Sequence, residues 1–176
     1  MPGTIETLAG IVGARLKAAG ALLATAESCT GGWISQAVTA VAGSSEWFDR
    51  GFVVYSNEAK QDLVNVRAET LARCGAVSED VAREMAVGGI ERSRAQVALA
   101  VTGIAGPSGG TPGKPVGMVC FAWAVRESGP GAKRGAIDAR SETRHFTGDR
   151  ESVRRQAVIR ALQGVIELLD GRVPQG

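Results

Sequence analysis

The sequence predicts a single α/β domain, a three-layer α/β/α sandwich built on a mixed, mostly parallel sheet. Segments with helical apolar spacing alternate with short buried strands through the first two thirds of the chain, which is typical of an α/β fold. Near the end, two strands follow each other as a hairpin and add antiparallel pairing. The length of 176 residues suits one domain and no linker interrupts it, so we assign residues 1–176 to a single unit.

The first part of the chain supplies helices and strands in alternation. Apolar residues recur at helical spacing from Ile5 to Leu16, and Gly20 is a typical helix stop. The apolar stretch that follows reads as a buried strand. The expected elements, in chain order, are helix 5–19, strand 21–28, a helix beginning at Trp33, strand 50–56, and helix 57–66 capped by Ser56 or Asn57.

The second part begins with a helix and ends with one. Ser78 is a typical N-cap, and the acids after it lie where the helix dipole favours them. Residues 126–141 are rich in glycine and charge, which predicts a flexible hairpin tip. The expected elements are a helix within 77–95, strands 95–103 and 118–125, a returning strand 142–148, and a last helix capped by Asp149 with an apolar face reaching Leu169.

Composition excludes several classes of protein. The formal charge of +2 comes from 20 basic and 18 acidic residues, too even a balance for a nucleic-acid surface. Cys29, Cys74 and Cys120 are widely spaced and form no C-x-x-C pair, which argues against a disulfide frame or a metal site and favours a reducing cytoplasm. The N-terminal region lacks the features of a signal peptide, and no apolar stretch is long enough for a membrane span. We therefore expect a cytoplasmic protein with no nucleic-acid or membrane partner.

The stretch TAESCTGG contains a candidate nucleophile. Ser28 lies at the end of a strand, where a turn with Gly31 and Gly32 opens a helix. Such a turn exposes a side chain and directs backbone N–H groups at one point, which suits a nucleophile with an oxyanion hole and makes Cys29, Thr30 and the two glycines candidates for substrate contacts. Alternatively, Ser28 or Thr30 simply caps the helix. Cys29 is a rival nucleophile, although a lone cysteine is more often a buried structural thiol.

A serine nucleophile needs a base, and two residues compete for that role. His145 is the only histidine, but it lies near the late hairpin with no acid in an obvious orienting position. Lys60 falls in the first turn of a helix, where burial and the positive end of the dipole would both lower the pKa of its amine. The alternative is an ordinary solvated lysine. Tyr55, the only tyrosine, could hold or relay a proton beside Lys60, or it could pack at the end of the strand.

The loop after the strand 95–103 resembles an anion cradle. Its glycines would let backbone amides approach an oxyanion or a phosphate closely. Lys114 and Arg150 could add positive charge there. The spacing matches neither of the common phosphate-binding motifs, so a surface loop without a ligand is an equally economical interpretation. The candidates from this region are Thr102, Gly103, Ala105, Gly106, Gly109 and Arg150.

Six segments, taken in order, resemble the CinA C-terminal domain family. They are AESCTGG, GSSEWFDRGFVVYSNEAK, GAVSEDVAREMA, TGIAGPSGG, KPVG and FTGDRESVRRQA, and the resemblance as a whole spans roughly residues 5 to 170. The resemblance implies an α/β/α fold. It also implies hydrolysis of nicotinamide mononucleotide to nicotinate mononucleotide and ammonia, a step in pyridine nucleotide recycling.

The resemblance also assigns roles to residues. Ser28 matches the nucleophile and Lys60 the general base, while Tyr55 and Thr102 match positions that line the site. The expected chemistry is attack of the serine on the carboxamide with Lys60 as proton acceptor, which requires no cofactor and no metal. Together with an aromatic cluster at residues 47–52, the resemblance favours a homodimer.

The chain departs from the family pattern in two places. Larger members carry an additional N-terminal domain with an associated pyrophosphatase activity, and we expect that activity to be absent because this chain starts at the first helix of the amidohydrolase domain. A glycine-rich insertion at residues 127–138 leaves the motifs intact. The alternative to an enzyme is a non-catalytic nucleotide-binding or regulatory module that uses the same glycine loops only to hold phosphate.

Overall fold

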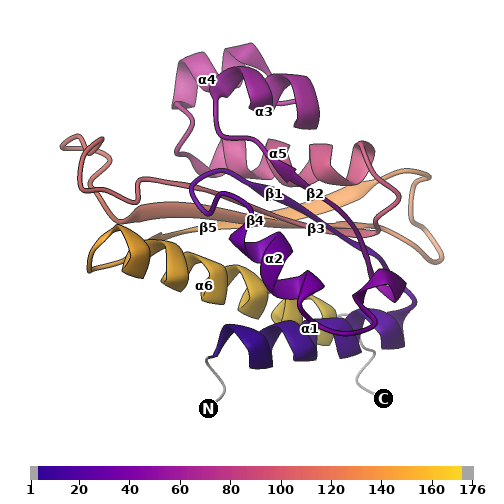
Figure 1. Ribbon diagram of the computed structural model, residues 1–176. Helices are drawn as coiled ribbons and strands as arrows, with labels where there is room; N and C mark the ends of the chain where they lie inside the picture. Colours follow the sequence, from indigo (N-terminus) through magenta and orange to yellow (C-terminus); the bar gives the residue numbers. More distant parts are fainter. Residues whose placement is uncertain (1–3, 172–176) are drawn as a thin grey trace.

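The computed structural model describes residues 4–171, which form a five-stranded sheet with helices on both faces (Figure 1). The strand order is β2-β1-β3-β4-β5. β1 pairs parallel with β2 and with β3, whereas β4 pairs antiparallel with β3 and with β5. Four strands therefore run in one direction, and the sheet is mixed as predicted. The strands are β1 (Leu23–Glu27), β2 (Phe48–Val53), β3 (Val97–Gly103), β4 (Met118–Arg126) and β5 (Ile137–His145).

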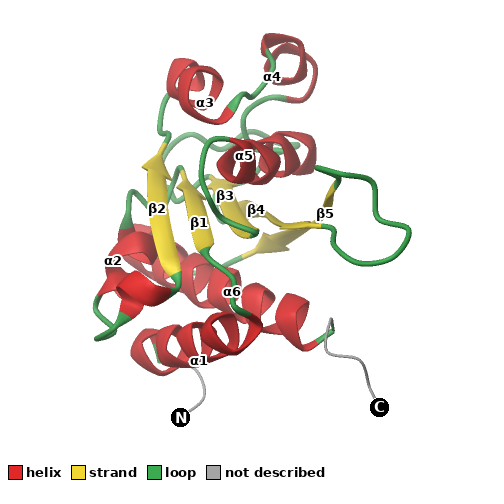
Figure 2. Ribbon diagram, turned by 90° about the vertical axis from the view of Figure 1, so that its right-hand side faces the viewer, coloured by secondary structure: helices red, strands yellow, loops and turns green. Residues whose placement is uncertain are grey.

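The helices lie in two layers, and this confirms the three-layer sandwich. Helices α3, α4 and α5 cover one face of the sheet, and α1, α2 and α6 cover the other (Figures 1 and 2). A short 3₁₀ helix, Ser44–Glu46, precedes β2. The helices are α1 (Ile5–Ala19), α2 (Trp33–Thr39), α3 (Asn57–Val64), α4 (Ala68–Cys74), α5 (Glu79–Glu91) and α6 (Arg150–Asp170).

The two faces of the sheet differ in the size of their side chains. Because side chains alternate along a strand, each strand contributes to two separate cores. The face toward α1 and α6 carries large residues such as Leu99, Phe121 and Trp123. The face toward α5 carries small ones, including Ala98 and Ala122. The small residues let α5 approach the sheet closely.

Two consecutive glycines in α5 are explained by this close packing. A Cβ atom on Gly88 would lie 1.7 Å from the backbone oxygen of Val64, at the end of α3, so only glycine fits there. A Cβ on Gly89 would lie 3.5 Å from Ala98 of β3, in ordinary contact. Glycine lowers the stability of a helix, but here the packing of α5 between α3 and the sheet offsets that loss.

Most of the predicted elements are confirmed, and the differences are local. Gly20 adopts a left-handed conformation after α1, and the side chains of Ser56, Ser78 and Asp149 cap α3, α5 and α6. The returning strand was placed too late: β5 begins at Ile137, so the loop between β4 and β5 covers residues 127–136, and residues 137–141 belong to the strand.

Helix α4 was not predicted, because it is seven residues long, buries only Thr70 and has no side-chain cap. The aromatic residues at 47–52 were expected to pack or to form a subunit contact, and Trp47 packs: it is 3% exposed and lies against Gly13 in the protein's own core. Phe48 and Phe52 are also partly buried against the two cores. All three cysteines are free thiols.

Candidate active site

A small pocket lies at the carboxyl ends of β1, β2 and β3, where it is lined by Ser28, Tyr55 and Thr102 among others. In α/β sheets, ligands bind beyond the carboxyl ends of the parallel strands. The pocket has a volume of about 170 Å³. Among the residues singled out from the sequence, those that line it are Ser28, Cys29, Tyr55, Lys60, Thr102, Gly103, Ala105 and Arg150.

Ser28 and Lys60 are in direct contact in this pocket. Ser28 follows β1, and the first turn of α3 carries Lys60. The distance between Lys60 Nζ and Ser28 Oγ is 3.0 Å. Both residues are buried, with 7% of Ser28 and 1% of Lys60 exposed. The fold therefore joins an alcohol and an amine that are 32 positions apart in the chain.

The hydrogen-bond partners of the Lys60 amine are uncharged. Besides Ser28, Nζ donates hydrogen bonds to the backbone carbonyl oxygens of Val54, at 3.1 Å, and Tyr55, at 3.0 Å. Burial in this environment lowers the pKa of Lys60 from its ordinary value of 10.5, because the charged form loses its hydration. The amine is therefore more easily deprotonated than a surface lysine.

The buried carboxylate of Glu27, which no pattern in the sequence indicated, holds the turn that carries Ser28. Glu27, the last residue of β1, is fully buried. Its oxygens accept hydrogen bonds from the Thr30 hydroxyl at 2.7 Å, from the backbone N–H of Ile34 at 2.8 Å, and from both the N–H and the hydroxyl of Ser35 at 2.9 and 2.7 Å. Glu27 thus joins β1 to the start of α2 and fixes the turn between them.

Arg154, a second residue that the sequence did not indicate, also holds this turn. Arg154 of α6 donates hydrogen bonds to the carbonyl oxygens of Cys29, at 3.0 Å, and Thr30, at 3.1 Å. Its guanidinium also lies over the ring of Trp33, 5.6 Å from the centroid. No local signal links Arg154 to a turn about 125 residues earlier, so only the folded structure shows this contact.

The rival nucleophile Cys29 is poorly activated. Burial raises the pKa of the Cys29 thiol to about 12, and the nearby cations Arg154 and Lys60 offset this only in part. Since the thiolate is the nucleophilic form, this cysteine is protonated at neutral pH. Of the two candidates in the turn, Ser28 has the better environment for attack.

Tyr55 contacts Lys60 through its backbone carbonyl, and the hydroxyl of Thr102 is already hydrogen-bonded to the backbone. The Tyr55 carbonyl holds Lys60, whereas 64% of the residue is exposed at the mouth of the pocket. The Thr102 hydroxyl donates to the carbonyl of Ala76 at 2.9 Å and ties β3 to the segment before α5. Three lining residues were not anticipated: Asn57, Ala76 and Val77.

The remaining candidates lie around the pocket rather than in its lining. Thr30 is fully buried against Glu27, while Gly31 and Gly32 have positive φ angles of 61° and 102° that form the turn. Gly109 likewise has a positive φ, of 96°. Gly106 accepts a hydrogen bond of 2.8 Å at its carbonyl from Arg150, which joins the loop after β3 to the start of α6.

His145 and Lys114, two other candidates from the sequence, lie outside the pocket. His145 is at the end of β5, opposite Met118 of β4. Lys114 donates to the carbonyl of Cys74. Within residues 4–171, no three His, Cys, Asp or Glu side chains gather closely enough to ligate a metal ion. No helix in this described part of the chain is long and apolar enough to cross a membrane.

The comparisons agree with this architecture. Residues 5–169 match the model of the CinA C-terminal domain family, so the chain belongs to that family. The nicotinamide-nucleotide amidohydrolase PncC of Escherichia coli (strain K12) is 55% identical over 152 residues, which cover 86% of this chain and 87% of that protein. The protein of the same name from Pseudomonas putida is 47% identical and covers 93% of this chain and 96% of its own.

A solved structure shows the same fold. The competence damage-inducible protein A of Klebsiella pneumoniae superposes with a TM-score of 0.87 and is 40% identical. The match covers 97% of this chain and 99% of the Klebsiella chain. The sheet and both helical layers are therefore shared with the Klebsiella protein.

Proposed function

We propose that this chain is a nicotinamide-nucleotide amidohydrolase, which hydrolyses nicotinamide mononucleotide to nicotinate mononucleotide and ammonia as a step in pyridine nucleotide recycling. The observation that carries the proposal is the contact of 3.0 Å between Lys60 Nζ and Ser28 Oγ in a buried pocket. The names of the PncC relatives, at 47 to 55% identity, support the choice of substrate.

The contacts of Lys60 suit a neutral amine that acts as a base. A neutral amine has two N–H donors and one lone pair. Two carbonyl oxygens, those of Val54 and Tyr55, take the two donors. In the neutral form, Ser28 Oγ, which lies 3.0 Å from Nζ, can donate its own proton to the lone pair. This arrangement poises the serine for deprotonation.

The first half of the reaction releases ammonia. Lys60 takes the proton of Ser28 as the serine oxygen forms a bond to the carboxamide carbon, and the electron pair of the C=O bond moves to its oxygen. The N–H groups of Gly31 and Trp33 already donate to the Ser28 and Thr30 carbonyls. We assign the oxyanion to the N–H groups of Cys29 and its neighbour Thr30, a type of contact that contributes about 2.7–4 kcal/mol. The C–N bond then breaks, and the nitrogen leaves as ammonia with the proton from Lys60.

The second half regenerates the enzyme. A water molecule gives a proton to Lys60 and attacks the ester carbon on Ser28. When the C–O bond to the serine breaks, Ser28 recovers its proton from Lys60 and the product leaves as a carboxylic acid, which ionises. Every proton passes through one amine, and no cofactor or metal takes part in these steps.

The size of the pocket suggests how the substrate lies. Its volume of about 170 Å³ is smaller than the about 300–1,000 Å³ of sites that enclose drug-sized ligands. The pyridine ring and carboxamide therefore enter the pocket, and the ribose phosphate stays at its mouth. There the exposed Arg150 and the loop at residues 102–110 supply positive charge and backbone donors for the 5′-phosphate.

Release of ammonia tests the proposal. The parent protein should release ammonia from nicotinamide mononucleotide, and Ser28→Ala and Lys60→Ala should each lose nearly all of this activity. Lys17→Ala, in an exposed lysine of α1, is the matched control and should keep it. Near-parental rates in either site variant would refute that residue's role.

Substrate comparisons separate the alternatives. A panel of nicotinamide mononucleotide, free nicotinamide and glutamine distinguishes the nucleotide from other small amides. Binding of the nucleotide without ammonia release would favour a non-catalytic nucleotide-binding module. We also propose that the protein is a cytoplasmic homodimer.

A further inference from the structure

The strand β5 is an open edge of the sheet. It is last in the strand order, and it pairs with β4 over nine residues without a bulge, from Ile137 opposite Arg126 to His145 opposite Met118. It contains no proline. A long, regular edge strand presents a row of backbone groups that can pair with another chain.

The backbone groups that face outward can be identified. Glu127 N–H donates to the Ala136 carbonyl at 2.8 Å, and Phe146 N–H donates to the Gly117 carbonyl at 2.8 Å, so even-numbered residues of this segment bond to the neighbouring strand. Hydrogen-bonded and non-hydrogen-bonded pairs alternate along an antiparallel ladder. The odd-numbered residues therefore direct their N–H and C=O groups to the open edge. They are Ile137, Ala139, Ser141, Thr143 and His145.

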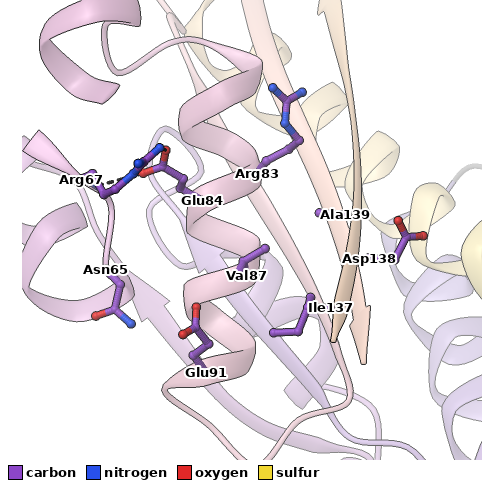
Figure 3. Close-up of a pocket in the computed structure, with 9 residues that line it drawn as sticks. All are labelled: Asn65, Arg67, Arg83, Glu84, Val87, Glu91, Ile137, Asp138 and Ala139. Atoms are coloured by element: carbon purple, nitrogen blue, oxygen red, sulfur yellow. Dashed lines mark hydrogen bonds and ion pairs between the residues drawn. The ribbon is translucent and has the colours of Figure 1, made fainter. Parts of the chain in front are cut away.

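The even-numbered side chains carry alternating charges on the face toward α6. Glu142 accepts a hydrogen bond of 3.1 Å from Arg160, and Arg140 donates one of 3.1 Å to the carbonyl of Gly164. Figure 3 shows Asp138 directed away from α5, which agrees with this alternation. In chain order the charges are negative at 138, positive at 140, negative at 142 and positive at 144.

In one register, every one of these four charges meets an opposite charge. If two copies of β5 run antiparallel with Ser141 opposite Ser141, then Asp138 faces Arg144 and Arg140 faces Glu142, twice over. The outward backbone groups also meet in this register. If the two-fold axis moves by one residue, to position 140 or 142, an arginine lies opposite an arginine. Like charges directly opposite each other destabilise a sheet, and registers centred on Ala139 or Thr143 form only two opposite-charge pairs instead of four, so the charges favour the register centred on Ser141.

A groove beside the edge has room for the partner's side chains. A cavity of about 550 Å³ is lined by residues of α5 such as Val87, by Asn65 and Arg67, and by Ile137 and Ala139 of β5 (Figure 3). In the register above, the side chains of Thr143 and His145 from a second copy lie opposite Ala139 and Ile137, on the face toward α5. The second copy would thus fill a groove that a single chain leaves open.

We propose that two copies of this chain dimerise by antiparallel pairing of their β5 strands about a two-fold axis at Ser141, which joins the two sheets into one. The interface does not depend on the proposed enzymatic activity, because no residue of β5 lines the pocket at Ser28. It replaces the aromatic cluster at residues 47–52 as the contact surface.

Charge reversal tests the register. Sedimentation equilibrium should give twice the chain mass of 18.2 kDa for the parent. Asp138→Arg and Arg144→Asp each place like charges opposite each other at two symmetric positions, so each should raise the dissociation constant on the order of tenfold or more. The double variant D138R/R144D restores both pairs and should recover the dimer. A monomeric parent at micromolar concentration, or a dimer that ignores the single reversals, would overturn the proposal.

A crosslink tests the axis without weakening the dimer. At a hydrogen-bonded antiparallel pair the Cα atoms are about 5.5 Å apart, within the range for a disulfide. In a Cys74→Ser background, Ser141→Cys should form an intermolecular disulfide on oxidation. Arg140→Cys is the matched control: its two copies would be about 8 Å apart, too far to bridge. Absence of the Ser141→Cys crosslink, or equal crosslinking of both variants, contradicts the placement of the axis, and ammonia release should be unchanged throughout.

Discussion

Replacing Lys60 by methionine removes the proposed base and keeps a side chain of similar length in the same buried space. Ser28 would then have no acceptor for its proton. General-base catalysis contributes about 10²–10⁴-fold to rates, so ammonia release should fall by about that factor or more. Lys60→Arg should fail similarly, because a guanidinium stays protonated and cannot act as a base.

The same substitution should change stability much less than activity. The Val54 and Tyr55 carbonyls lose the hydrogen bonds from Nζ, and each buried unpaired group costs about 1–3 kcal/mol. Against this, the parent keeps an amine out of water, and burying an ionisable group carries a penalty of several kcal/mol when it is charged. The two effects oppose each other, so we expect a net change within about 2 kcal/mol, or about 8 °C in Tm.

The assay pairs ammonia release at saturating nucleotide with thermal unfolding of each variant. A large loss of activity in a protein whose Tm is little changed supports the assignment of Lys60 as base. If Lys60→Met keeps a rate within a few-fold of the parent, the reasoning fails.

Three further predictions concern the turn and the mouth of the pocket. The carboxylate of Glu27 accepts hydrogen bonds from two backbone N–H groups, and in Glu27→Gln the amide NH₂ would face one of them without an acceptor. Calorimetry should therefore show that the free energy of unfolding falls by about 1–3 kcal/mol. An unchanged Tm would show that Glu27 does not hold the turn. Cys29→Ala should keep most of the ammonia release, because burial raises the pKa of this thiol to about 12, whereas complete loss in a folded variant would point to the thiol as nucleophile. Arg150→Met should raise KM for nicotinamide mononucleotide with little change in kcat, while the nucleoside without the 5′-phosphate should show no such difference; an equal effect on both would remove Arg150 from phosphate binding.

Elements with strong local signals were the ones predicted well. Gly20 marks the end of α1, and the Ser78 side chain accepts from the N–H of Val81 at the start of α5, so both boundaries could be read from the sequence. Helix α4 and the first half of β5 lacked such signals. β5 in particular carries charges at alternate positions on an edge of the sheet, and the sequence pattern alone suggested a loop.

The proposed reactive groups could be singled out from the sequence, whereas the residues that hold the turn around Ser28 could not. Ser28 and Lys60 lie in recognisable segments after two strands, and the parallel strands bring those segments together. Glu27 is hidden in an apolar strand, and its partners follow within eight positions in a turn whose geometry is set only on folding. Arg154 is about 125 residues from the turn that it holds, so no spacing in the sequence could indicate it.

The pH dependence of kcat/KM for nicotinamide mononucleotide tests the central claim most directly. Because burial lowers the pKa of Lys60 and only the neutral amine accepts a proton, kcat/KM should rise with pH through a midpoint below 10.5 and then level off. The same limb should be missing from the residual activity of Lys60→Met. A profile that is flat or falls over this range, or a limb that persists in Lys60→Met, would contradict a neutral lysine as the base for Ser28.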